Sequence, residues 1–272
     1  MKCVDPIRIT DPADQRIAAY RNIRERDLSG REGLFIAEGK VVLNVLFAAR
    51  RFAVESVLLL ENRVAGMEET LRTAPEGTPV YVADHAVMDG IAGFHLHRGV
   101  LAVGQRRTGD RLPDLIEELP GRAVIVVLIG ISNHDNVGAI FRNAAAFGAD
   151  AVLLDRTSCD PLYRKAIRVS VGAALKVPFV RDGDADSILA ALSGAGFEVL
   201  ALSPDGGLDI VEFSPTGRTA LVLGTEGEGL PAALLAKLRT ARIGMAAGFD
   251  SLNVAAASAV ALHHLWRRSQ VG

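Results

Sequence analysis

The sequence predicts an α/β protein with a mostly parallel sheet in its second half and a smaller α/β unit before it. From about residue 122 onward, apolar β-branched runs alternate with helical stretches, a pattern typical of strands covered on both faces. Shorter runs of the same kind occupy residues 1–105. A polar stretch with two prolines separates the halves. We therefore expect a domain at 1–105, a linker at 106–121 and a domain at 122–272.

Composition limits the classes of partner. The 272 residues are enough for two domains, and 49% hydrophobic with 23% charged residues is usual for folded soluble proteins. The formal net charge of -2 gives no global attraction to nucleic acid or membrane, so an RNA partner needs a local basic patch. The apolar run 123–131 is too short for a membrane span, and residues 1–10 lack a secretory signal. With two distant cysteines, we expect a cytoplasmic protein without membrane partners.

Local patterns place the individual elements. In the first half, a densely apolar stretch predicts a buried helix at 37–49, and β-like runs predict strands at 54–60, 79–82 and 99–103. The second half is predicted to hold strands at 123–131, 151–154, 198–202 and 219–223. Its predicted helices lie at 136–147, 187–193, 231–238 and 251–267.

The first candidate site follows the strand at 123–131. Loops at the carboxyl ends of parallel strands are where α/β sheets bind ligands. Asn136 begins the next predicted helix, and Arg142 lies more than a turn and a half further along it. A capping asparagine and a solvated arginine are the alternative interpretation of this spacing.

The second candidate is the glycine-rich loop 224–231. Its order is the reverse of the dinucleotide fingerprint, no Gly-Lys-Ser/Thr follows, and its two carboxylates would repel phosphate. We interpret the glycines as allowing the backbone to approach a neutral or cationic ligand, with Glu226 as an acceptor. A flexible acidic turn is the alternative.

The third candidate is the stretch 243–254. We predict that Asp250 or Ser251 caps the last helix, which leaves Asn253 early in that helix. Asparagine is a poor helix former there unless its amide binds something. Neither histidine pair, 95 with 97 or 263 with 264, has a third ligand, so no metal is expected.

Arginine is frequent in the first half. Because its planar guanidinium suits phosphate, an RNA-facing surface is one interpretation, and a solvated face with interspersed acids is the other. The residues concerned are Arg16, Arg21, Arg24, Arg26, Arg31, Arg50, Arg51, Arg98, Arg106, Arg107 and Arg111.

Together the three stretches resemble the SpoU-TrmH family of RNA ribose 2'-O-methyltransferases, within the SPOUT superfamily. The matching pieces are Asn-x-Gly-x-x-x-Arg at 136–142, the loop at 223–230, and the pieces at 243–245 and 251–254. Residues 1–105 more loosely resemble the L30e-like substrate domain of the family, mostly at 35–39. The sequence departs from the family pattern at His134-Asp135, Gly244 and Ala255-Ala256.

The resemblance implies a trefoil knot in the second domain, a homodimer with the active site near its interface, and S-adenosyl-L-methionine as methyl donor. The donor-binding residues that it implies are Leu223, Gly224, Ile243, Met245, Leu252 and Asn253. The catalytic residues that it implies are Asn136, Arg142, Glu226, Ser251 and Asn253.

The substrate that the resemblance implies is structured RNA. A domain ahead of the catalytic half resembles the rRNA-modifying members, so we expect 23S rRNA, with tRNA as the alternative. A non-catalytic RNA-binding module on the same fold is a further alternative. A nucleotide-dependent oxidoreductase is disfavoured by the glycine order of the loop 224–229. Because arginine stays protonated, we expect Arg142 to orient the hydroxyl or phosphate rather than act as a base.

Overall fold

The computed structural model describes residues 5–21, 33–92, 99–215, 217–248 and 250–270. The chain forms two compact units, the first made of Met1–Thr108 with Leu162–Lys176 and the second of Gly109–Pro161 with Val177–Gly272. The sequence pattern alone places 162–176 with the rest of 122–272. Among the described residues, no helix has the length and apolarity needed to cross a membrane.

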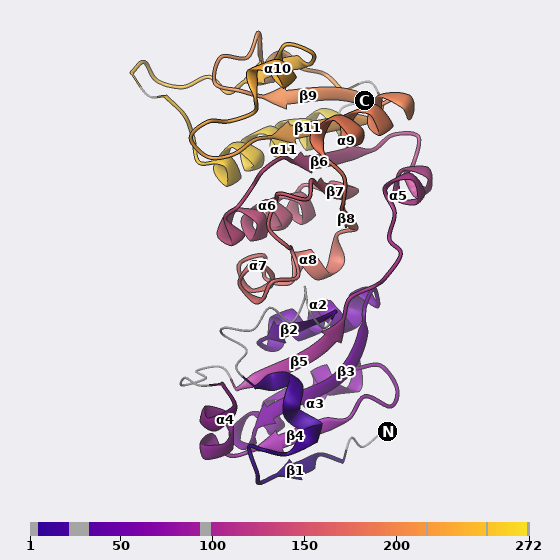
Figure 1. Cartoon of the computed structure of the whole chain (residues 1–272), viewed down its shortest axis with the longest axis vertical. Coiled ribbons are helices and arrows are strands. Elements are labelled where there is room, and N and C mark those ends of the chain that lie inside the picture. The colour runs from indigo at the N-terminus through magenta and orange to yellow at the C-terminus, as the bar shows by residue number, and fades with distance from the viewer. Residues whose placement is uncertain (1–4, 22–32, 93–98, 216, 249, 271–272) are drawn as a thin grey trace. The chain divides into compact units, whose positions relative to one another are not determined.

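The first unit is built on a five-stranded sheet of order β1-β4-β3-β5-β2 (Figure 1). Its core includes the fully buried Tyr20, whose hydroxyl lies 2.8 Å from the Ser56 hydroxyl. The strands are β1 (Ile7–Ile9), β2 (Leu34–Glu38), β3 (Ala53–Leu60), β4 (Val80–Ala83) and β5 (Val100–Gln105). The helices are η1 (Gln15–Tyr20), α2 (Lys40–Ala49), η2 (Glu61–Arg63), α3 (Val64–Arg72), α4 (His85–Ala92), α7 (Arg164–Val169) and α8 (Ala173–Lys176).

The apolar stretch that predicts a helix at 37–49 contains both a strand and a helix. Strand β2 ends at Glu38 and α2 begins at Lys40. Gly39 separates them with a φ of 98°, a left-handed conformation that suits glycine. In β2, Glu38 is buried and accepts a hydrogen bond of 2.7 Å from Arg164 of α7.

The second unit contains a parallel seven-stranded sheet of order β10-β12-β9-β11-β6-β7-β8. The predicted strands at 151–154, 198–202 and 219–223 are confirmed as β7, β9 and β11, while β8, β10 and β12 were not predicted. The strands are β6 (Val124–Leu128), β7 (Ala151–Leu154), β8 (Phe179–Arg181), β9 (Glu198–Leu202), β10 (Leu208–Asp209), β11 (Thr219–Leu223) and β12 (Arg239–Arg242).

Helices cover both faces of this sheet, as the sequence predicted (Figure 1). Helix α5 lies inside the stretch predicted as a linker, because Pro113 is tolerated in a first helical turn and Ile116 is buried in the core. Helices α6 and α11 pack against each other. The helices are α5 (Leu112–Glu118), α6 (His134–Ala146), α9 (Ala185–Gly194), η3 (Ile210–Glu212), α10 (Ala232–Leu235) and α11 (Val254–Ser269).

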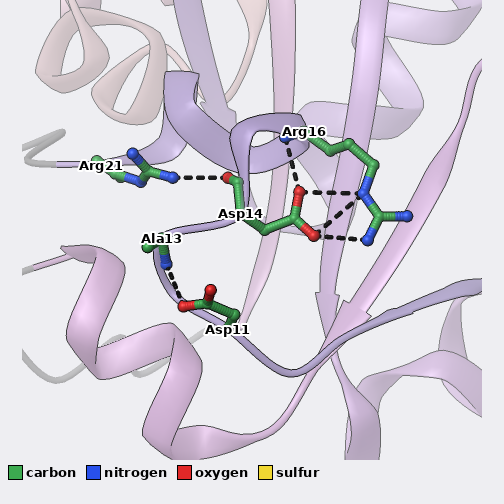
Figure 2. A network of polar contacts seen from close by, with 5 residues as sticks. All are labelled: Asp11, Ala13, Asp14, Arg16 and Arg21. Carbon is green, nitrogen blue, oxygen red and sulfur yellow. Dashed lines mark hydrogen bonds and ion pairs between the residues drawn. The ribbon is translucent and has the colours of Figure 1, made fainter.

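A polar network fixes the segment that enters η1, in the first unit. Figure 2 shows the Arg16 guanidinium facing the Asp14 carboxylate, with a shortest N–O distance of 2.5 Å. Arg21 donates to the Asp14 carbonyl oxygen at 2.6 Å, and the Ala13 amide donates to Asp11 at 2.7 Å. The side-chain hydrogen bond from Arg16, followed by that from its backbone amide, lowers the pKa of Asp14 to about 2.

Replacing Arg16 with glutamine is expected to raise the pKa of Asp14 toward its ordinary value, whereas Arg21→Gln should change it much less. The pKa is depressed in the folded state, so the stability contributed by this pair is present above about pH 4 and is lost as the pH falls through about 2. An NMR titration of the Asp14 carboxyl carbon measures both variants. Equal shifts in the two would contradict the assignment to Arg16.

Candidate functional site

A cavity of about 630 Å³ lies at the carboxyl ends of β9, β11 and β12 in the second unit. These strands are parallel neighbours in the order β12-β9-β11, so the loops that follow them emerge at one edge of the sheet. The segment that enters α11 completes the lining. All six predicted donor-binding residues line the cavity: Leu223, Gly224, Ile243, Met245, Leu252 and Asn253.

The glycine-rich loop after β11 folds back on itself. Thr225 and Gly229 form an antiparallel bridge, with the Gly229 amide donating to the Thr225 carbonyl at 3.2 Å. A Cβ atom on Gly224 would lie 2.5 Å from the backbone of Gly229 and Leu230. The glycine is therefore needed so that two backbone segments can touch. The sequence interpretation assigned the glycines to approach of a ligand, which stays a prediction.

Asn253 connects the three candidate stretches. Its Oδ1 accepts hydrogen bonds from the amides of Ala255 and Ala256 at 2.9 and 3.2 Å, so Asn253 caps α11. The prediction that Asp250 or Ser251 is the cap was wrong, because the helix begins three residues after Ser251, at Val254. The prediction that Asn253 lies early in the helix was also wrong, because Asn253 is the cap, a position that favours asparagine. Its side-chain nitrogen does bind other residues of this chain.

The partners of that amide are two residues of the predicted catalytic set. Asn253 Nδ2 donates to Glu226 Oε1 at 2.6 Å and to Asn136 Oδ1 at 3.1 Å. Because Oδ1 already caps the helix, the orientation of the amide is fixed, and it can only donate toward these two oxygens. Glu226 and Ser251 also line the cavity, so four of the five predicted catalytic residues lie together.

Asn136 carries a buried donor that lacks a partner. The residue is only 5% exposed, and its Oδ1 accepts from Asn253. Its Nδ2 has no hydrogen-bond partner among the described residues. An unsatisfied buried donor costs about 1–3 kcal/mol, and such groups are uncommon outside functional sites.

Of the five predicted catalytic residues, Asn136 and Arg142 do not line the cavity: Asn136 adjoins it through its hydrogen bond with Asn253, whereas Arg142 has no such link among the described contacts. It is exposed on α6, six residues after Asn136. Six residues of α-helix correspond to a rotation of about 240°, so the two side chains leave the helix in different directions. Arg142 is also not among the residues that line the cavity.

Two residues that sequence reasoning missed hold the walls of the site. Asn143 Nδ2 donates to the Ala255 carbonyl at 2.8 Å and to the Ser258 hydroxyl at 2.9 Å, which joins α6 to α11. The sequence does contain a signal for Asn143: it follows Asn136 by seven residues, which places both on the same face of the helix.

The second missed residue is Asp155, which follows β7 and is 5% exposed. Its Oδ1 accepts from the Gly130 amide at 3.0 Å and from the Ser158 hydroxyl at 2.6 Å. The contact with Gly130 fixes the loop between β6 and α6, and so supports the position of Asn136. An acidic residue after a purely apolar strand was the available sequence signal.

The cavity is acidic. Asp205, Glu226 and Glu228 line it, and no lysine, arginine or histidine does so among the described residues. Asp205 belongs to the loop after β9, which sequence reasoning did not single out. The apolar lining includes Leu202 and Leu252. A ligand that is partly apolar and carries positive charge suits this combination, and the volume is in the usual range for small-molecule sites.

The arginines proposed as an RNA-facing surface have varied positions. Arg16 and Arg21 contact their own segment, as described above, and Arg51 lies over the Phe52 ring at 5.0 Å. Arg24, Arg26, Arg31, Arg98, His95 and His97 lie outside the described residues. In the part of the chain that the structure describes, no group of three or more acidic, histidine or cysteine side chains could hold a metal ion.

Replacing Gly224 with alanine is expected to lower the free energy of unfolding by about 2 kcal/mol, because the added methyl meets backbone that must move. Gly194→Ala is the matched control, since a Cβ there meets open space and should change stability by less than about 1 kcal/mol. Urea unfolding followed by circular dichroism compares the two. Equal stabilities would contradict the close contact.

The sequence pattern of the SpoU rRNA Methylase family matches residues 123–263. An uncharacterised tRNA/rRNA methyltransferase of Mycobacterium bovis is 39% identical over 95% of this chain and 91% of that protein. A 23S rRNA (guanosine-2'-O-)-methyltransferase, RlmB, of Ralstonia nicotianae is 31% identical over 75% of this chain and 84% of that protein.

Similarity to solved structures also extends over nearly the whole chain. The structure of an AdoMet-bound rRNA methyltransferase from Sinorhizobium meliloti has a TM-score of 0.80 at 22% identity, over 98% of this chain and 99% of that one. At this identity the likeness concerns the fold alone. The family pattern spans the strands and loops that form the cavity, and a relative at 39% identity extends over nearly the whole chain. The chain therefore belongs to the SpoU rRNA methylase family of RNA methyltransferases.

Proposed function

We propose that this protein transfers a methyl group from S-adenosyl-L-methionine to a ribose 2'-oxygen in 23S rRNA. One observation carries the proposal: an acidic, partly apolar cavity adjoins the hydrogen-bonded cluster of Asn136, Asn253 and Glu226. The resemblance to a 23S rRNA (guanosine-2'-O-)-methyltransferase over three quarters of the chain supports this choice of RNA.

The residues of the cavity fit the donor. S-adenosyl-L-methionine has a flat adenine, for which the leucine side chains offer apolar surface, and two cationic groups, for which the carboxylates offer opposite charge. Three glycines of the glycine-rich loop, Gly224, Gly227 and Gly229, are part of the cavity lining, so backbone forms part of its wall. When bound, the donor supplies an electrophilic methyl on a sulfonium sulfur.

The protein then has to align the ribose and handle its hydroxyl proton. We assign Asn253 and Ser251 to holding the loop before α11, and Glu226 and Asn136 to positioning the sugar. The unpaired Nδ2 of Asn136 is a donor available to an oxygen of the substrate once the site adjusts to bind it. Arg142 is assigned to the ribose 2'-hydroxyl or to a phosphate of the RNA, since a guanidinium suits both.

A homodimer would account for the position of Arg142. This side chain lies outside the cavity of its own chain, and an active site near a subunit interface allows an exposed residue to act there. Helix α11 also exposes Val260 and Trp266, 44% and 39% accessible. Such apolar side chains on one helix are suited to a contact between copies. The trefoil knot that the resemblance implies is part of the same proposal.

We assign substrate recognition to the first unit, as an L30e-like domain. The larger part of this unit, Met1–Thr108, precedes the family-matched region, which favours a large structured RNA, and we keep tRNA as the alternative. A non-catalytic RNA-binding module is disfavoured because the cluster at Asn253 is intact.

Replacing Arg142 with alanine is expected to lower methyl transfer at least about 100-fold while the Kd for the donor stays within about 2-fold, because the side chain lies outside the cavity. Arg122→Ala, another exposed arginine of the second unit, is the control and should keep full activity. Radiolabelled methyl transfer and calorimetry give the two readouts. Undiminished transfer by the Arg142 variant would refute its role.

The choice of RNA is tested with purified protein, labelled donor and total RNA from cells that lack the protein. We expect label in 23S rRNA, at one position that resists alkaline cleavage because its 2'-oxygen is blocked. Label confined to tRNA would favour the alternative substrate. Binding of RNA without any transfer, under conditions where the donor binds, would favour the non-catalytic module.

A further inference from the structure

One acidic side chain of the cavity lies outside all three motifs. Asp205 belongs to the turn that follows β9, in which the Gly206 amide donates to the Ser203 carbonyl at 3.0 Å. This turn lies directly against β12, because a Cβ on Gly206 would overlap the Ala241 backbone.

The turn is held on both sides of Asp205. The Ser203 amide donates to the Ala241 carbonyl at 2.9 Å, and the Arg242 guanidinium donates to the Gly206 carbonyl at 2.8 Å. Asp205 therefore lines the cavity from a turn anchored to the sheet. Its position is defined by backbone contacts rather than by a long flexible segment.

The charge of the cavity is not balanced from within. Asp205, Glu226 and Glu228 line it, and among the described residues no cationic side chain does. The partner of Glu226 is the neutral amide of Asn253, so this carboxylate also keeps its charge uncompensated. Arg242 lies next to the turn but is not part of the lining.

Methyl transfer changes the charge of the donor molecule that would occupy this cavity. The bond between sulfur and the methyl carbon breaks with its electron pair left on sulfur, while a lone pair of the ribose oxygen forms the new bond to that carbon and the hydroxyl proton passes to solvent water. The sulfonium of the donor thereby becomes a neutral thioether in the product, S-adenosylhomocysteine. All other groups of the two molecules are the same.

We propose that the Asp205 carboxylate makes this cavity selective for the donor, which carries a positive sulfonium, over the product, whose sulfur is neutral. Methyl transfer would then lower the affinity of the cavity for the molecule bound in it. The inference rests on the proposed function, because it needs that donor in that cavity. In this proposal the negative charge of Asp205 determines how much more tightly the cavity binds the donor than the product.

The size of the effect follows from Coulomb's law. For a carboxylate that lines the cavity, an effective dielectric constant between that of water and that of a protein surface gives a change in the Kd of a cationic ligand of about 3- to 10-fold. In about 1 M salt the screening length falls to about 3 Å, so the effect should largely disappear.

Asp205→Asn removes the charge and keeps the shape, and Asp205→Glu keeps the charge. Calorimetry on the full chain gives the Kd of S-adenosylmethionine, S-adenosylhomocysteine and sinefungin, an analogue with an ammonium at the sulfonium position. We expect Asp205→Asn to weaken the two cationic ligands about 3- to 10-fold and the product less than about 2-fold. Asp205→Glu should retain most of the selectivity. Glu118→Gln, exposed on α5, is the control for net charge.

Two results would overturn the inference. If Asp205→Asn weakened all three ligands equally, Asp205 would contact a group that they share, and unchanged affinities would mean that its charge is not felt. Either result leaves the proposed function standing, since the ligands still bind. If the wild-type protein bound none of the three, the proposed function would fail and the inference with it.

Discussion

The arrangement of the site depends on the hydrogen bonds of the Asn253 side chain. One oxygen caps α11, and one nitrogen holds a residue of the glycine-rich loop and a residue of α6. An amide has one acceptor end and one donor end, so these two roles orient each other. An aspartate at this position could cap the helix but could not donate to Glu226, and a serine could not reach all the partners in the same way. Segments more than a hundred residues apart thus meet at a single group.

The parallel sheet and most of the cavity could be predicted from the sequence. Apolar β-branched runs gave β7, β9 and β11 their correct bounds, and parallel strands must send their following loops to one edge. The matched motifs then indicated which side chains of those loops line the cavity. Asn253 caps α11, where asparagine is favoured, and its contacts with Asn136 and Glu226 give it a second role at the cavity.

The remaining features lacked a local signal. Strand β12 has the sequence Arg-Thr-Ala-Arg, and it is a strand because β9 and β10 pair with it on either side. Helix α5 was hidden by Pro113 within it and Pro120 after it, although Ile116 is in the core. The anchoring of Asp205 depends on contact of its turn with Ala241. Tertiary contacts of this kind cannot be inferred from composition or periodicity.

Asn253 is both the cap of α11 and the centre of the polar cluster. The cluster therefore forms only when α11 packs onto the rest of the unit. During synthesis, a polypeptide that has not yet placed α11 has neither Ser251 nor Asn253 at the cavity, whatever the state of its other strands. The cavity lining and its polar cluster are therefore complete only in a chain in which α11 is in place.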